Sequence, residues 1–143
     1  REGAKYQELI KERRSLGELD HPDSPIVQLE NVSHLLTETN WDGDDLVGTV
    51  EVLDTPKGQI LEKLIGRDIK LGISSRGLGS TSRTNEGYDM VEDDFSLVCY
   101  DMVSNPSTSG AYMNLQESRE YKTLVSQNRM VLLDEILNDI LEL

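Results

Sequence analysis

The stretch Lys70-Leu71-Gly72-Ile73-Ser74-Ser75-Arg76-Gly77 is the part of the sequence around which the chain is organised. A short apolar run ends there in two hydroxyl groups, a guanidinium group and a glycine. Small polar residues followed by glycine mark the end of a strand and the start of a turn. The stretch therefore predicts a strand whose end places polar side chains at an open rim rather than in a core.

Either serine of this stretch is a candidate nucleophile, and side-chain alternation separates the two. Successive side chains of a strand point to opposite faces. Ser75 shares its face with Leu71 and Ile73, so we expect Ser75 to face the core. The same alternation places Ser74 toward the open side and favours it as the nucleophile.

A candidate general base lies upstream, in the segment Asp20-His21-Pro22. Histidine is the usual general base near neutral pH, and flanking prolines restrict this turn. A histidine in such a turn is also commonly a solvated surface residue, so this alternative stays open. The second histidine, His34, lies in a strand pattern and is expected to be buried and hydrogen-bonded.

A carboxylate that orients the base is expected in the apolar strand 94–103. Asp101 has the alternation of the buried face there, and a buried carboxylate needs a partner such as a histidine ring N–H. A solvated acid at the strand end is the alternative for Asp101. Asp93, Asp94 and His34 remain alternatives for the third catalytic residue.

The residues after the candidate nucleophile supply possible oxyanion donors. Backbone amides at Ser75, Arg76 and Gly77 would each contribute about 100–1000-fold in rate if they contacted a developing oxyanion. The Arg76 side chain has an alternative role as an ordinary surface charge.

The pattern along the chain predicts a single α+β domain with a mostly antiparallel sheet flanked by helices. Thr55-Pro56 marks a helix start, because proline fits the first helical position. The Gly17 region is expected to end the first helix, and residues 77–89 are expected to form a mobile loop. The expected elements are a helix at 4–14, strands from 26 and at 46–53, a helix to Ile65, strands at 69–74 and 94–103, and a long amphipathic helix from about 118.

Composition excludes several classes of protein. The chain has 143 residues and a formal net charge of −13, which argues against a nucleic-acid partner. No apolar stretch approaches the ~20 residues of a membrane span. The single cysteine, Cys99, predicts no internal disulfide and a reducing setting. No metal-ligand spacing or phosphate-binding glycine motif is present, so we expect neither a metal nor a cofactor.

Several short motifs, taken in their order and spacing, carry a family resemblance. The sequence from about 19 to 113 resembles the prohead core proteases of T-even-type tailed phages. These belong with the phage prohead serine proteases and are similar in fold to the herpesvirus assemblins. The motifs are Asp20-His21-Pro22, Ser24-Pro25-Ile26-Val27, Asn31-Val32-Ser33-His34, Trp41-Asp42-Gly43, residues 70–77 and Asp101-Met102-Val103-Ser104-Asn105-Pro106-Ser107.

The resemblance implies a fold, a reaction and a place of action. The implied fold is compact and β-barrel-like, similar to the herpesvirus protease. The implied activity is serine endopeptidase, with His21 and Ser74 as catalytic residues. Relatives carry Glu near the position of Cys99 or Asp101. The implied substrates are scaffold and capsid proteins inside the immature head in the host cytoplasm, cut after Glu in a Leu/Ile-x-Glu context.

Three further expectations concern organisation and specificity. We expect an N-terminal helix in 1–18, a catalytic core in 19–113 and a C-terminal helical segment in 114–143 that either caps the domain or pairs copies as a homo-oligomer. A basic group should meet the substrate Glu, with Arg76, Lys70 and Arg83 as candidates. Leu/Ile-x-Glu sequences near the ends of the chain, those ending at residues 12, 18, 117, 135 and 142, suggest self-cleavage of a zymogen. The rival hypothesis is a non-enzymatic capsid or scaffold assembly module.

Overall fold

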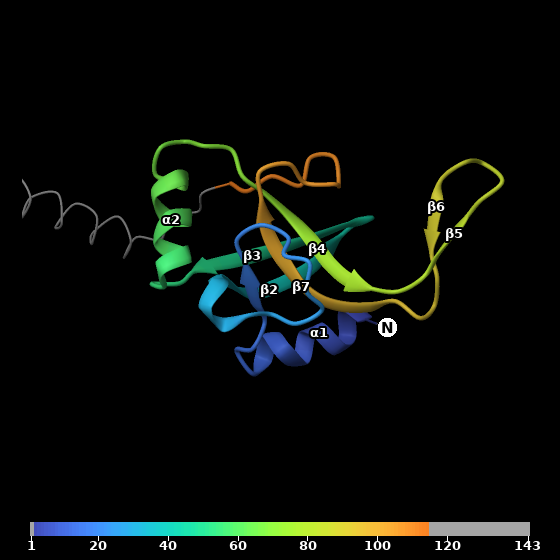
Figure 1. Cartoon of the computed structure of the whole chain (residues 1–143), viewed down its shortest axis with the longest axis horizontal. Helices are drawn as coiled ribbons and strands as arrows, with labels where there is room; N and C mark the ends of the chain where they lie inside the picture. The colour runs from blue at the N-terminus through green and yellow to red at the C-terminus, as the bar shows by residue number, and fades with distance from the viewer. Residues whose placement is uncertain (1, 115–143) are drawn as a thin grey trace, which may run out of the picture. The chain divides into compact units, whose positions relative to one another are not determined.

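The computed structural model describes residues 2–114 of the chain (Figure 1). This range is α+β, as the sequence predicts. Its elements are α1 (Glu2–Lys11), β1 (Leu16–Glu18), a 3₁₀ turn η1 (Leu29–Asn31), β2 (Val32–Asp42), β3 (Asp45–Val52), α2 (Pro56–Ile65), β4 (Gly72–Leu78), β5 (Thr81–Arg83), β6 (Asp89–Val91) and β7 (Ser96–Val103).

The described strands form three antiparallel sheets, in the orders β1-β2-β3, β4-β7 and β5-β6. The expected barrel-like closure is wrong for this range. A barrel needs a hydrogen-bonded ladder that runs round to its first strand. Within residues 2–114, no ladder joins the first two sheets, and the backbone bridge between them, from Leu19 to Met102, lies where the chain leaves β1. This junction joins β1 to β7 and carries the segment that follows it over β7.

The apolar core forms where α2 covers strand residues. Leu61, Leu71 and Met102 are buried together, with Val50 and Val52 of β3 packed against them. The predicted start of α2 is confirmed. Thr55 Oγ1 accepts a hydrogen bond from Gly58 N at 3.0 Å, and Pro56 occupies the first turn. The cap satisfies one of the free amides of the helix start and fixes where α2 begins.

The first half of β2 is buried on both faces. Ser33 and His34 are both fully buried. His34 Nδ1 lies 2.8 Å from Ser33 Oγ, and His34 Nε2 lies 2.8 Å from the Tyr100 carbonyl oxygen. A neutral imidazole satisfies both contacts, with Nε2–H donating to Tyr100. The prediction of a buried, hydrogen-bonded His34 is therefore confirmed.

The predicted break at Gly17 is instead part of β1, so residues 1–18 are not one helix. A Cβ atom at Gly17 would lie 2.2 Å from both His34 Nε2 and the Tyr100 carbonyl oxygen. Glycine is needed here for the close approach of three strands, and glycine inside a strand often has this meaning. Sequence patterning alone does not separate this use from helix termination.

Two further boundaries differ from prediction. The strand expected at 69–74 is β4, which runs from Gly72 through Leu78, so its serines lie inside a strand rather than at its end. The loop expected at 77–89 contains β5 and reaches β6, which pair as a hairpin. The predicted C-terminal helix from about 118 lies outside the described residues. Within residues 2–114, no helix is both long and apolar enough to cross a membrane.

The close approach at Gly17 predicts a large destabilisation for Gly17→Ala. The added methyl group would collide with backbone and with His34, so the free energy of unfolding should fall by about 1–3 kcal/mol or more. Gly3→Ala is the matched control, because a Cβ atom at Gly3 of α1 meets nothing within 4 Å. That change should be neutral or stabilise by up to about 1 kcal/mol. Urea denaturation of both variants measures the difference, and equal effects would contradict the packing account.

The buried His34 predicts a pH dependence of stability. Burial lowers the pKa of His34 from 6.5, and this outweighs the opposing effects of the Tyr100 carbonyl and the Asp101 charge. The unfolded chain therefore binds a proton below about pH 6.5 that the folded chain does not, so stability is lost as the pH falls through that value. Denaturation midpoints at about pH 8 and pH 5.5 should differ more for the native chain than for His34→Gln. Equal pH dependence in the two chains would refute this.

Candidate active site

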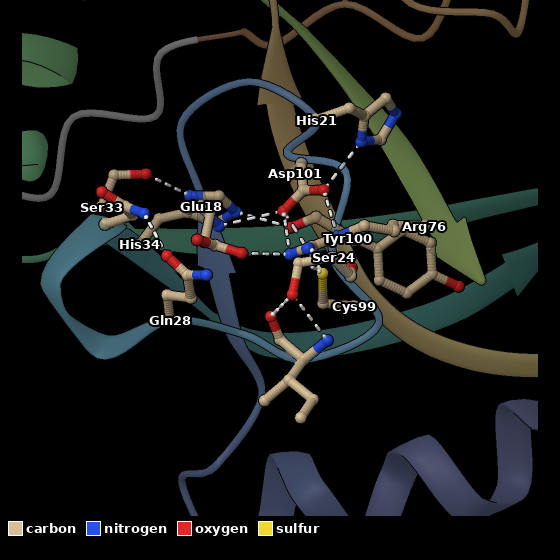
Figure 2. A network of polar contacts seen from close by, with 12 residues as sticks. Glu18, His21, Ser24, Gln28, Ser33, His34, Arg76, Cys99, Tyr100 and Asp101 are labelled. Atoms are coloured by element: carbon tan, nitrogen blue, oxygen red, sulfur yellow. Dashed lines mark hydrogen bonds and ion pairs between the residues drawn. The ribbon is translucent and has the colours of Figure 1, made fainter. Parts of the chain in front are cut away.

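His21 and Asp101 are joined by a short hydrogen bond, although 80 positions separate them in the sequence. His21 Nδ1 lies 2.7 Å from Asp101 Oδ2, and Figure 2 shows the imidazole ring directed at this carboxylate. The Asp101 side chain is fully buried, whereas that of His21 is 40% exposed. The ring therefore has one nitrogen held from inside the molecule and a substantial part of its surface accessible to solvent.

The turn before His21 places the ring there. Asp20 has a φ of +66°, in the left-handed region that Asp and Asn tolerate better than most residues. Asp20 N donates to the Met102 carbonyl oxygen at 2.7 Å. The turn is thus fastened to β7 one residue beyond Asp101, which brings the next residue of the turn over the Asp101 carboxylate.

The Asp101 carboxylate is surrounded by donors from three strands. Oδ1 accepts hydrogen bonds from Glu18 N of β1 at 3.0 Å and from Arg76 Nη2 of β4 at 3.2 Å. Arg76 Nε lies 2.9 Å from Oδ2, as an ion pair whose angles are not those of a hydrogen bond. The Cys99 thiol of β7 donates to Oδ1 at 3.3 Å. These contacts offset the cost of burying the Asp101 charge.

Arg76 is a buried partner of two carboxylates, not a surface charge, so that alternative is wrong. It is only 9% exposed, and its Nη2 also donates to Glu18 Oε2, while Nη1 donates to the Ser24 carbonyl oxygen at 2.9 Å. Burial disfavours the charged form of Arg76. The hydrogen bonds to Glu18 and Cys99 and the charge of Asp101 outweigh burial and raise the Arg76 pKa. The side chain therefore stays cationic inside a buried polar cluster that consists of Glu18, Arg76, Cys99 and Asp101.

Ser74 lies directly opposite Asp101 in the β4–β7 ladder. Directly opposed residues of an antiparallel pair place their side chains on the same face. Ser74 and Arg76 are therefore on the face that carries Asp101 and Cys99. Ser74 is 7% exposed, and its Oγ lies 3.1 Å from Ser107 Oγ. Within residues 2–114, no hydrogen bond joins the Ser74 side chain to His21.

This arrangement reverses the predicted facing of the two serines. Ser74 is buried and Ser75 is exposed, because the covered face of β4 is lined by the polar cluster rather than by apolar side chains. The alternation argument assumed that burial follows Leu71 and Ile73. The choice of Ser74 over Ser75 by alternation thus rested on a wrong assumption about which face of β4 is covered, whereas Asp101 lies on the buried face of β7 as predicted.

Ser75, Arg76 and Gly77, the predicted oxyanion residues, all lie within β4. The ladder shifts register between Arg76 and Gly77. A Cβ atom at Gly77 would lie 2.3 Å from the Phe95 ring, which explains glycine at this position by packing. Their role as amide donors to an oxyanion stays a prediction.

The alternatives for the third residue lie elsewhere. Asp94 Oδ2 accepts hydrogen bonds from Ser80 N and Oγ, which lower the Asp94 pKa. Asp93 is exposed. His34 contacts Tyr100 and Ser33 instead of His21. Of the four candidates, the structure brings only Asp101 to the imidazole of His21.

Sequence reasoning missed three residues around this site. Glu18 and Cys99 line the cluster beside Asp101, and Ser107 contacts Ser74. Burial and the neighbouring Asp101 raise the pKa of the Cys99 thiol to about 12, so it remains a neutral donor. The position of Cys99 two residues before Asp101, on the same strand face, was the one available signal. Among residues 2–114, no group of three or more acidic, histidine or cysteine side chains is placed to hold a metal ion.

The arrangement supports general-base chemistry at the other imidazole nitrogen. A carboxylate that accepts from Nδ1–H fixes the tautomer and leaves Nε2 free to take a proton. A hollow of about 310 Å³ lies beside the His21 segment. It is lined by Pro22, Asp23, Ser24, Pro25, Arg76, Gly77, Leu78 and Val98. A ligand in this hollow would contact the segment that carries His21 and the strand that carries Ser74.

Comparison with known proteins places the chain in one family. The model of the family "Prohead core protein serine protease" matches residues 3–123. The chain is 35% identical over 119 residues to the prohead core protein protease of Enterobacteria phage T4, covering 81% of this chain and 56% of that protein. The structure of the bacteriophage T4 capsid assembly protease matches with a TM-score of 0.64 and 30% identity, covering 71% of this chain and 64% of that one. The chain thus spans less than two thirds of the length of either relative, and it belongs to the prohead core protein serine protease family.

Proposed function

We propose that the chain is a serine endopeptidase of phage head maturation, acting inside the prohead in the host. The observation that carries this proposal is the 2.7 Å contact of His21 with buried Asp101, with Ser74 directly opposite Asp101 in the ladder. The contact supplies an oriented base, and the ladder places the Ser74 alcohol on the strand face that carries Asp101; a base and an alcohol are what nucleophilic catalysis requires. Membership of the prohead protease family supports scaffold and capsid proteins as the substrates.

In the proposed reaction, Ser74 Oγ attacks the carbonyl carbon of the scissile peptide bond. His21 Nε2 takes the hydroxyl proton and returns it to the leaving amine. Asp101 stays ionised and stabilises the imidazolium form of His21. A water molecule, activated by His21 in the same way, then hydrolyses the acyl-enzyme. Amides near Ser75 are proposed to hold the oxyanion.

The proposed specificity is cleavage after Glu in a Leu/Ile-x-Glu context. Of the three basic candidates for the substrate Glu, Arg76 already contacts Glu18 and Asp101, which leaves little donor capacity for a substrate. Lys70 is exposed, with Nζ 4.1 Å from the centre of the Tyr112 ring, and Arg83 is exposed on β5. Lys70 and Arg83 are therefore the better candidates for an accessible positive charge.

The proposed catalytic roles predict that Ser74→Ala or His21→Ala removes nearly all peptidase activity. Residues that act as a unit each lose close to the whole effect, on the order of a million-fold in kcat. Ser75→Ala is the matched control, because Ser75 lies on the opposite, exposed face of β4, and it should retain activity. Hydrolysis of a Leu-x-Glu peptide and of head proteins measures the effect.

Labelling by a fluorophosphonate, located by peptide mass spectrometry, identifies the reactive serine in the same samples. The label is expected on Ser74 and should be lost in His21→Ala. Both the full chain and a self-processed form need to be labelled, since an inactive zymogen would not react. Absence of label and of hydrolysis in both forms would support the assembly-module hypothesis instead.

The exposure of Glu12 and the burial of Glu18 distinguish two of the possible self-cleavage sites. Of the two motifs in residues 1–18, Ile10-Lys11-Glu12 lies at the end of α1 with Glu12 exposed, whereas Glu18 is fully buried in β1. A protease needs an accessible segment that can unfold locally, and the end of a helix does so more readily than a buried strand, so cleavage is expected after Glu12 and not after Glu18. Mass spectrometry of incubated protein should show a new terminus at Arg13. Glu12→Gln and Ser74→Ala should each abolish it, and a cut after Glu18 would contradict the prediction.

A further inference from the structure

Glu18 and Arg76 form a buried ion pair that the proposed reaction does not itself use. Glu18 is fully buried, and Arg76 is 9% exposed. A buried ion pair is weak evidence for stability, because removal of two charges from water costs about as much as their attraction returns. The position of this pair directly against Asp101 points to another role (Figure 2).

We propose that Glu18 and Arg76 are positioning residues, which fix the Asp101 carboxylate and set the charge that it presents to His21. The catalytic consequence rests on the proposed function above, but the effect on His21 does not. Arg76 contacts both carboxylate oxygens of Asp101, with Nε on Oδ2 and Nη2 on Oδ1. The hydrogen bonds of Nη2 and Glu18 N to Oδ1, with the ion pair of Nε and Oδ2, hold the carboxylate so that Oδ2 faces His21.

The net charge next to His21 depends on Glu18, Arg76 and Asp101 together. A cation as close as Arg76 would by itself cancel the attraction of Asp101 for an imidazolium group. The carboxylate of Glu18 on the other side of Arg76 balances that cation. With both carboxylates ionised, the cluster carries one negative charge, and protonation of His21 brings it to zero. Glu18 thereby keeps the charge that the cluster presents to His21 negative without touching the ring.

Other charged or titratable groups near His21 are few. On the elements packed against His21, the groups are Asp101 and the neutral Cys99 thiol of β7, Arg76 of β4 and Glu18 of β1. On its own segment, Asp20 and Asp23 are exposed. Exposed charges are screened by water and salt, so the buried groups dominate.

The decisive experiment follows the His21 ring by NMR as the pH is changed. The chain has two histidines, and His34→Gln assigns the two signals. Glu18→Gln should move the His21 titration midpoint to lower pH by about one unit, because the uncompensated Arg76 then faces the imidazolium. Glu18→Gln combined with Arg76→Gln should return the midpoint to near its native value, because the single negative charge of Asp101 is restored.

A purely structural role predicts the opposite result for the double variant, which loses more contacts than the single one. Glu51→Gln, alone and with Arg13→Gln, is the matched control, because this pair has the same charges at 3.2 Å but is 46% and 63% exposed. Neither control should move the midpoint by more than about 0.2 units. Arg76→Lys is a milder test at the arginine position, because it keeps the positive charge. It should keep the His21 midpoint within about 0.3 units but lower kcat, because the single ammonium group of lysine cannot hold both Asp101 oxygens as the guanidinium group does.

Peptide hydrolysis provides the second measurement. Glu18→Gln should lower kcat about tenfold and move the acid limb of the profile of kcat/KM against pH to lower pH. The double variant should regain the native position of that limb. An unchanged midpoint in Glu18→Gln, or a further fall in the double variant, would overturn the proposal. The predicted midpoint shifts in a chain that hydrolyses nothing would support the pair and refute the proposed peptidase function alone.

Discussion

A fully buried carboxylate, Asp101, constrains the rest of the described structure. An ionised group inside a protein requires several hydrogen-bond donors, and each donor must come from a backbone position that is itself fixed. Here the donors are the Glu18 amide of β1, the Arg76 guanidinium of β4 and the His21 ring on the segment after β1. The register of β4 with β7 and the bridge from Leu19 to Met102 are both needed to satisfy Asp101. The same interactions that make the fold possible therefore assemble the candidate site.

The polar cluster and the apolar core have different roles in this molecule. Leu61, Leu71 and Met102 fill a small core under α2, which apolar burial stabilises without strict geometry. The cluster around Asp101 gains little net energy from its ion pairs but tolerates few arrangements, since an unpaired member would be costly. Burial of the apolar core thus stabilises the fold, while the polar cluster holds the His21 imidazole in one orientation. This division explains why so many charged groups are buried at the junction of the two sheets.

Sequence patterns predicted the elements that depend on local signals. Thr55-Pro56 carries a cap and a helix-compatible proline, so the start of α2 follows from neighbouring residues. The family resemblance and the buried face of β7 led to His21 and Asp101. The patterns failed where burial is polar. Ser74 was expected on the open side because the covered face was taken to be apolar, and Glu18 was missed because a short strand such as β1 has no periodicity to detect. Such features depend on contacts between distant segments.

Of the two side-chain contacts that the candidate site needs, one is formed in this structure and the other is not. Asp101 and His21 are already joined, whereas Ser74 shares its hydrogen bond with Ser107 on the segment after β7. Catalytic hydrogen bonds are often incomplete before substrate binds and form in the complex. In this structure a hydrogen bond from Ser74 to His21, which the proposed mechanism needs, is not formed. The contact between His21 and the buried Asp101 is formed. An exchange of Ser107 for His21 as the partner of Ser74 involves one neutral hydroxyl, so it disturbs none of the buried charges. Under the proposed mechanism, this arrangement would leave Ser74 unactivated while the oriented imidazole and the buried charges stay in place.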